Sequence, residues 1–354
     1  AGTVNDGNGG ANYDVTFATV DTGEITHRAI TVTATTDTKV YDGTTVSSAL
    51  PTITSGSLVT GQTATWSQTF DTRNAGSGKT LTPTGQIDDA GVRDNYAVTF
   101  VVNHDGCITP KPLTVSGLSA ENKEYDGTTR ATIDVSAAAL VGVLEEDTVT
   151  LDTSSAIGTF DNRNVGGGKT VTISGLTLGG AHAANYSLAN PAVTASITKR
   201  AITVKAVNDS KTYDCNTASD GVPVIISGSL ATGDNDTGSW TQVFDTKHVG
   251  ANNKTLTPSG AVNDGNDGAN YNVTLVPIHT GTITRKAITV TATGPDTKVY
   301  DGTTASDEVP TITVGSLMGD DTVTWTQTFD TKHVDTIKTL IPHGTVVDGN
   351  GGFN

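Results

Sequence analysis

Two Gly-Lys-Thr turns contain residue types that could bind phosphate. GSGKT begins at position 76 and GGGKT at position 166. A phosphate-binding loop needs a further glycine five residues before the glycine of the Gly-Lys pair, and a helix after the loop. Arg73 and Arg163 occupy that place here, and no helical period follows. Both segments are therefore interpreted as turns rather than nucleotide sites.

Acidic loops offer a second kind of chemistry. DGNGG begins at 6 and at 348, and DGNDG at 264. Carboxylate and amide oxygens are the ligands that calcium prefers, but the EF-hand spacing is missing, and Asn-Gly and Asp-Gly pairs are also common in hairpins. We interpret the loops as turns and expect no cofactor, with structural Ca²⁺ as the alternative. Its candidate ligands are Asp6, Asp264, Asp267, Asp320 and Asp321.

The histidines do not form a catalytic pattern. His248 and His333, in two copies of FDTKHV, are replaced by Asn74 and Asn164 in the other copies. The sequence also has no nucleophile elbow. We predict no catalytic residues and no enzymatic activity.

Lysines recur at fixed places beside Asp and Asn. A buried lysine beside Asn and a carboxyl group could form an isopeptide cross-link, because a desolvated amine becomes nucleophilic. Ordinary ion-paired lysines are the favoured interpretation. The recurrent lysines are Lys39, Lys123, Lys211 and Lys298, and a second series of Lys79, Lys169, Lys254 and Lys338.

Cysteines and tryptophans give possible interface residues. Two cysteines, Cys107 and Cys215, are too few for a disulfide scaffold. Free thiols are favoured, and a bridge between neighbouring chains is the alternative. Trp66, Trp240 and Trp325 each lie four residues before a Phe-Asp pair, whereas the second copy has Ala156. Core packing is favoured for them, with a contact to an adjacent repeat or chain, or a sugar-stacking surface, as alternatives.

The elements that would position these residues repeat along the chain. KVYDGTT begins at 39, KEYDGTT at 123, KTYDCNT at 211 and KVYDGTT again at 298, at spacings of 84, 88 and 87 residues. Phe-Asp and Asn-Tyr pairs keep the same period. The predicted domains are the end of an incomplete repeat at 1–26, complete repeats at 27–110, 111–198 and 199–284, and a truncated repeat at 285–354.

Within a repeat, the local pattern predicts about seven short strands. AITVTA alternates apolar and Thr residues, and Asp-Gly turns separate such segments. The fold expected is all-β, a linear series of immunoglobulin-like β-sandwiches, with a β-grasp-like module containing a short helix as the alternative. The tyrosines of both repeated motifs are predicted to be structural: Tyr41, Tyr125, Tyr213 and Tyr300 in one, and Tyr13, Tyr96, Tyr186 and Tyr271 in the other.

Composition and charge narrow the possible partners. The formal net charge of -16 disfavours nucleic acids and anionic lipids, because phosphates would be repelled. The sequence has no apolar run of the roughly 18 residues that a membrane span needs. The expected partners are neighbouring repeats or copies of the chain, with no nucleic acid and no membrane in this segment.

The ordered combination of YDG, Phe-Asp, Gly-Lys-Thr and Asn-Tyr resembles the YDG repeats of large bacterial secreted proteins, including haemagglutinin-like adhesins. It is carried by KEYDGTT at 123, FDNRNVGGGKTVT at 160 and NYSL at 185. The resemblance implies an extracellular structural stalk or filament at the bacterial cell surface. A glycan- or cell-binding adhesive module is the alternative function. No catalytic residues are implied.

Overall fold

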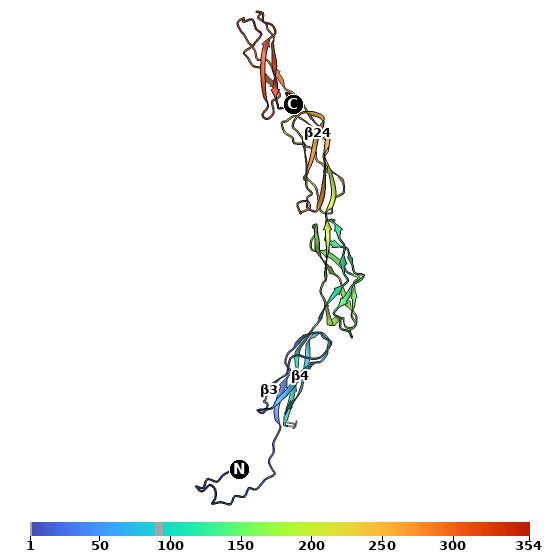
Figure 1. Cartoon of the computed structure of the whole chain (residues 1–354), viewed down its shortest axis with the longest axis vertical. Helices are drawn as coiled ribbons and strands as arrows, with labels where there is room; N and C mark the ends of the chain where they lie inside the picture. Colours follow the sequence, from blue (N-terminus) through green and yellow to red (C-terminus); the bar gives the residue numbers. More distant parts are fainter. Residues whose placement is uncertain (1, 89–94) are drawn as a thin grey trace. The chain divides into compact units, whose positions relative to one another are not determined.

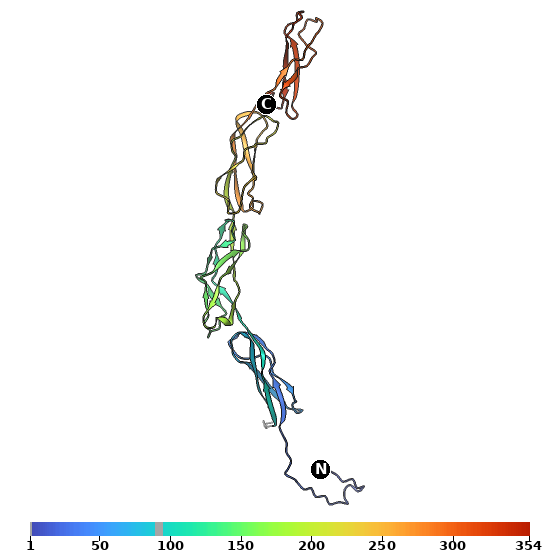
Figure 2. The same cartoon turned by 180° about the vertical axis from the view of Figure 1, so that it is seen from behind.

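The computed structural model describes residues 2–88 and 95–354. The described part of the chain is built from strands, with one three-residue 3-10 helix, η1 (Ala183–Asn185). The all-β prediction is confirmed, and strands appear along the whole sequence after residue 27 (Figures 1 and 2). No helix in this described part has the length and apolar character of a membrane span.

The first repeat contains two sheets, which we call the first and second sheet of a repeat. Its first sheet has the order β3-β1-β6, and its second has the order β2-β7-β5-β4. β3 and β4 are labelled in Figure 1. The strands are β1 (Arg28–Thr33), β2 (Thr38–Val40), β3 (Thr52–Ser55), β4 (Thr63–Phe70), β5 (Gly76–Asp88), β6 (Tyr96–Val101) and β7 (Asn103–Thr109). Residues 89–94, between β5 and β6, lie outside the described residues.

The second repeat follows the same plan with shorter strands. Its first sheet is β13-β8-β18 and its second is β10-β19-β16-β15-β11, with the small pairs β12-β9 and β14-β17 beside them. The strands are β8 (Lys111–Ser116), β9 (Ser119–Ala120), β10 (Lys123–Glu124), β11 (Arg130–Ala131), β12 (Ile133–Asp134), β13 (Ala139–Val141), β14 (Thr150–Asp152), β15 (Ile157–Phe160), β16 (Gly166–Ser174), β17 (Thr177–Gly179), β18 (Tyr186–Leu188) and β19 (Ala192–Thr198).

The third repeat has one three-stranded and one four-stranded sheet, and each described sheet of the fourth repeat has two strands. Sheets β22-β20-β25 and β21-β26-β24-β23 form the third repeat, and pairs β27-β28 and β29-β30 form the fourth. The strands are β20 (Arg200–Lys205), β21 (Ser210–Thr212), β22 (Val224–Ser227), β23 (Trp240–Phe244), β24 (Gly250–Gly260), β25 (Tyr271–Val276), β26 (Ile278–Thr284), β27 (Thr289–Thr291), β28 (Thr311–Val314), β29 (Thr322–Phe329) and β30 (Leu340–Val347).

The first and last strand segments of a repeat pair in parallel. β1 pairs β6 from Arg28↔Tyr96 onward, and β2 pairs β7, whereas β4 and β5 form a long antiparallel hairpin. Immunoglobulin sandwiches are described as two antiparallel sheets. The immunoglobulin comparison therefore covers the all-β character of a repeat but not this pairing. The short helix of the alternative fold corresponds to the single turn η1 before β18.

The compact units of the structure do not follow the sequence repeats. One unit contains the chain up to Gly117 together with Ala137–Ser155 and Gly175–Pro191, and the other contains the remaining residues. The first unit therefore holds the first repeat plus the first sheet of the second repeat. In both units the last strand of a repeat leads directly into the next repeat, because Pro110 alone separates β7 from β8 and Lys199 alone separates β19 from β20.

Hydrophobic clusters cross the boundaries between repeats. In the first unit, Tyr41 and Phe70 of repeat one share a cluster with Leu113 and Tyr186 of repeat two. In the second unit, one cluster combines residues of repeats two and three, and another reaches Met318 of repeat four. The cluster of repeats two and three contains Tyr125, Ala131, Phe160, Val171, Ala195, Ile197, Ile202, Val204, Ala231, Trp240, Val262 and Tyr271. Each of these hydrophobic clusters is therefore formed by residues of two successive repeats.

A buried glutamine explains one difference between repeats. Gln242 accepts the N–H of Val207 at 2.9 Å and donates to its carbonyl at 2.9 Å, so its amide pairs like a backbone group. Gln68 and Gln327 do the same in repeats one and four. Repeat two has Gly158 there, and a Cβ built on it would lie 2.4 Å from Ile133 Cγ2. The Ile133 side chain therefore fills the space that glutamine occupies elsewhere.

Candidate functional site: the junctions between repeats

A buried carboxylate lies between repeats two and three. The Asp234 side chain is 0% exposed. The Tyr125 phenol of repeat two donates to its Oδ1 at 3.3 Å, and the Tyr271 phenol of repeat three donates to its Oδ2 at 2.8 Å. The two rings meet edge to face with centroids 5.6 Å apart. Tyrosines from both repeated motifs thus bind one carboxylate.

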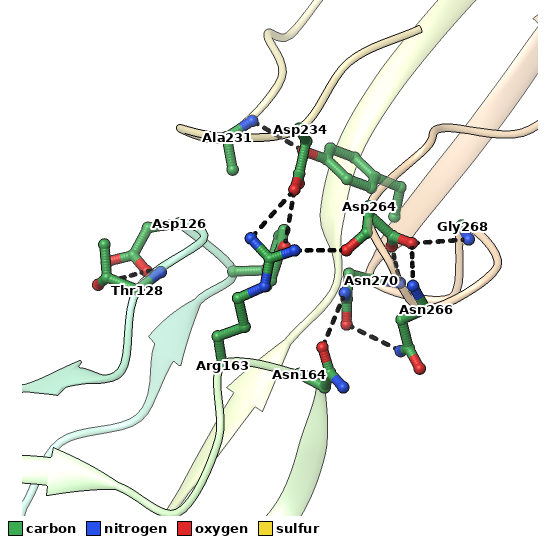
Figure 3. A network of polar contacts seen from close by, with 12 residues as sticks. Asp126, Thr128, Arg163, Asn164, Ala231, Asp234, Asp264, Asn266, Gly268 and Asn270 are labelled. Atoms are coloured by element: carbon green, nitrogen blue, oxygen red, sulfur yellow. Dashed lines mark hydrogen bonds and ion pairs between the residues drawn. The ribbon is translucent and has the colours of Figure 1, made fainter. Parts of the chain in front are cut away.

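Arg163 of repeat two supplies the positive charge of this junction. Its Nη1 lies 3.3 Å from Asp234 Oδ1, and its Nη2 donates to the backbone carbonyl of Asp264 at 2.6 Å (Figure 3). A buried carboxylate is costly unless it is paired and hydrogen-bonded, and Asp234 has both kinds of partner. The guanidinium therefore connects two separate loops of repeat three to repeat two.

An asparagine completes the junction. Asn270 Oδ1 accepts the backbone N–H of Val165 at 2.9 Å, and Asn270 Nδ2 donates to Asn164 Oδ1 at 3.2 Å. Asp264 shapes the loop that presents Asn270, because its carboxylate accepts the N–H groups of Asn266, Gly268 and Asn270 at 2.7–3.1 Å (Figure 3). Burial raises the pKa of Asp264, but the hydrogen bonds from Gly268, Asn266 and Asn270 outweigh it and hold this pKa below its usual value.

The same arrangement joins repeats one and two within the other unit. Tyr41 and Tyr186 donate to Asp147 Oδ2 at 2.8 and 2.7 Å. Arg73 Nη2 lies 3.2 Å from Asp147 Oδ1. The matching asparagine bond runs from Ala75 N–H to Asn185 Oδ1 at 2.9 Å. Because the geometry recurs with sequence-equivalent residues, the junction is a built feature of the repeat.

The junction of repeats three and four is a variant. Tyr213 donates to the Asp321 carboxylate at 3.1 and 3.2 Å, and Val249 N–H donates to Asn354 Oδ1 at 3.0 Å. Lys247 replaces the arginine, and its Nζ lies 3.1 Å from Cys215 Sγ. Cys215 stands where the other copies have glycine and has a φ of 66°. The polar pairing is retained while its cation is changed.

Burial and the nearby carboxylates perturb the pKa values of the junction tyrosines. Burial, followed by the hydrogen bond to Asp147, raises the pKa of Tyr41 to about 12. The pKa of Tyr125 is also raised to about 12, by burial and then by its hydrogen bond to Asp234. For Asp147, burial would raise the pKa, but the bonds from Tyr186 and Tyr41 and the charges of His182 and Arg73 bring it below its usual value.

This shift gives a pH-dependent stability at the first junction. A carboxylate with a lowered folded pKa stabilises the protein above its unfolded pKa of about 3.9, and that contribution is lost as the pH falls through the folded value. We expect Asp147→Asn to reduce the free energy of unfolding at pH 7 and to reduce it less at pH 3. Urea denaturation of both proteins at the two pH values measures this. A penalty that does not change with pH would contradict the assignment.

The repeated seven-residue phrase has a local structural role as well. Lys39 Nζ lies 2.8 Å from Asp42 Oδ1, donates to the Thr44 carbonyl at 2.8 Å, and stands 5.5 Å from the Phe70 ring centroid. Asp42 also accepts the Thr44 N–H at 2.9 Å, which fixes the turn. Equivalent lysines lie over Phe160, Phe244 and Phe329. In the first three repeats these ion-paired lysines hold the turn next to the tyrosine that enters the junction.

The candidate calcium ligands are not brought together. Asp6 repeats the Asp264 arrangement locally, accepting the N–H groups of Asn8, Gly10 and Asn12. Asp321 binds Tyr213, and Asp267 lies in a turn with φ 54°. Asp320 neighbours Asp321 in sequence. Among the described residues there is no group of three or more potential metal ligands.

The other candidate residues are dispersed. Cys107 and Cys215 are free, half-buried thiols. Trp66 packs edge to face on Phe100 of its own repeat, Trp240 is buried, and Trp325 is half-buried opposite Gly344. The Tyr96 phenol oxygen accepts the Val59 N–H at 2.9 Å. Tyr13 and Tyr300, in contrast, are exposed.

Sequence analysis missed the junction aspartates as a set. Asp147, Asp234 and Asp321 lie 22, 21 and 21 residues after the tyrosine of the preceding phrase. That period was the available signal, but repeat one has Gln62 in this place, where it hydrogen-bonds Tyr96. Arg73 and Arg163 carry no such signal in the sequence, where they only exclude a phosphate-binding loop.

Comparison with known families finds one family along the chain. The YDG domain family matches the chain four times, at residues 26–102, 109–195, 198–278 and 284–354. The chain therefore belongs to the YDG domain family. No curated protein is significantly similar to it.

Proposed function

We propose that this chain is a structural segment of an extracellular bacterial stalk or filament. Its activity is mechanical connection rather than catalysis, and its partners are neighbouring YDG repeats. The observation that carries this proposal is the repeated junction, in which Asp147 or Asp234 is buried between two tyrosines and an arginine. In each of these two junctions the carboxylate is held by phenols from two successive repeats.

Two further features support a connecting role. Strands run from one repeat into the next across Pro110 and Lys199, which leaves no flexible linker at these points. The apolar clusters are shared across the same boundaries. In repeat proteins, stability is the sum of internal terms and interfaces between neighbours, so such interfaces make an array resist separation of its members. The net charge of -16 favours solubility of a long array.

Pulling single molecules of the whole chain by its ends tests the proposal. We expect discrete force peaks, each from the cooperative unfolding of a folded part of the chain, and each releasing a length of about 3.6 Å per unfolded residue less the folded length. The same chain in concentrated urea is the control and should extend without peaks. Smooth extension under native conditions would contradict a mechanical role. Antibody labelling of intact cells that make the natural protein would test the extracellular location.

A further inference from the structure

In repeats one, two and three, strands from the two ends of the repeat run side by side in the same direction. In repeat one, β1 pairs β6 in the first sheet, and β2 pairs β7 in the second sheet. In repeat three, β20 pairs β25 and β21 pairs β26 in the same way. Repeat two has the pairs β8-β18 and β10-β19. We call these the parallel pairs of a repeat, and they occur in both of its sheets.

The repeated seven-residue phrase takes part in the second parallel pair. In repeat one, Lys39 lies opposite Ile108 in the register of β2 and β7, and the Tyr41 N–H donates to the Thr109 carbonyl at 2.9 Å. The tyrosine thus extends the parallel pairing with its backbone and enters the junction with its side chain. The equivalent bonds, both N–H to carbonyl at 2.9 Å, are Tyr125 to Thr198 and Tyr213 to Thr284.

The direction of these strands decides how a pull along the chain acts on their hydrogen bonds. The chain enters repeat one at Arg28, where β1 begins, and leaves it at Thr109, where β7 ends. Because β1 and β2 run parallel to β6 and β7, these two points lie at opposite ends of the paired strands. Tension therefore slides the strands past each other along their length, and the evenly spaced hydrogen bonds of a parallel ladder bear the force together.

Buried side chains keep water away from the parallel pairs. In repeat three, Ile202 and Val204 of β20 are 2% and 0% exposed, and Ile283 of β26 is 1% exposed. In repeat one, Val32 of β1 and Ile108 of β7 are buried to the same degree. A backbone hydrogen bond that water cannot reach finds no replacement partner as it breaks, so its rupture costs the desolvation of both groups. The parallel pairs are therefore sheared in dry surroundings.

We propose that the parallel pairs are the sites that resist tension in each of these repeats. The inference rests on the mechanical role proposed above and assigns that role to particular strands. Pro110 alone separates β7 from β8, and Lys199 alone separates β19 from β20, so the strand that ends one repeat leads directly into the parallel pair of the next. Force therefore passes from pair to pair at these two points without a flexible segment between them.

Single-molecule pulling of the whole chain in two directions tests this inference. Handles on Lys199→Cys and Arg285→Cys, which flank repeat three, apply the force along its parallel pairs. Handles on Lys205→Cys and Leu275→Cys, at the ends of β20 and β25, pull the same two strands apart sideways. All four side chains are exposed. We expect the first direction to need a rupture force several times that of the second, because sideways pulling opens the bonds one after another.

Both proteins also carry Cys107→Ser and Cys215→Gly, so that handles attach only to the new cysteines. Urea denaturation is the control, and equal midpoints would show that the two proteins differ only in the direction of pulling. Equal rupture forces in the two directions, or a higher force for sideways pulling, would overturn the inference. Neither result affects the proposed mechanical connection, which fails instead if the chain pulled by its ends extends without force peaks.

Discussion

Asp234→Ala is expected to loosen the junction between repeats two and three by about 2–4 kcal/mol. The substitution leaves the Tyr125 and Tyr271 phenols without their acceptor, and each unsatisfied buried group costs about 1–3 kcal/mol. It also leaves Arg163 without its carboxylate, although that side chain is 35% exposed and keeps some hydration. The total is therefore below the simple sum of these losses.

Hydrogen exchange followed by mass spectrometry locates this effect. The Val165 N–H donates to Asn270 Oδ1 across the junction, and the Ala231 N–H donates to the Tyr271 phenol oxygen beside it, so both should lose protection. Asp234→Asn, which keeps an acceptor and removes the charge, should give a smaller loss. Asp220→Ala, at an exposed position of the same repeat, is the control and should change stability by no more than about 0.5 kcal/mol. Unchanged exchange at Val165 in Asp234→Ala would show that the carboxylate does not hold the junction.

Much of the fold was predictable because its signals are local. The alternation in AITVTA reports one buried and one exposed face, and in the structure Ile30 and Val32 are buried. Asp-Gly turns fix where a strand ends, because Asp42 binds its own backbone and Gly43 takes a φ of 79°. These effects act within a few residues and can be identified without knowing the partner strand.

The junctions could not be predicted because a repeated sequence does not show which copy a residue contacts. Tyr41 binds Asp147, 106 residues away, and not the equivalent position in its own repeat, Gln62. Periodicity gives both residues the same phase, so sequence spacing is identical for contact within a repeat and contact with the next one. The choice is made by strand direction, since β7 continues into β8 and brings the two repeats end to end.

The sequence also did not show which residues compensate for a lost side chain. The second copy has Gly158 where the other copies have Gln68, Gln242 and Gln327. The structure shows Ile133 in the vacated space, from a strand 25 residues earlier in the chain. Packing exchanges of this kind conserve volume rather than residue type, so position-by-position comparison of the copies does not reveal them.

Phe160→Ala is expected to destabilise repeats two and three together, at a cost of about 3–5 kcal/mol. Phe160 is 2% exposed, supports Lys123 at 5.5 Å from its ring centroid, and belongs to the cluster that includes Ile202 and Tyr271 of the next repeat. The cavity left by the substitution therefore weakens a core that is formed by residues of both repeats. If each repeat had a closed core, the loss would stop at residue 198.

Hydrogen exchange separates these alternatives, because a shared core should transmit the loss to the Tyr271 N–H and its neighbours in repeat three as well as to the Phe160 N–H. Phe100→Ala in repeat one, where the ring is 40% exposed, provides the control and should have a smaller effect confined to its own repeat. Protection lost in repeat two but fully kept in repeat three would mean that the junction joins independent domains. Loss in both would place the cooperative unit across the sequence boundary, as expected when neighbouring interfaces carry much of the stability of an array.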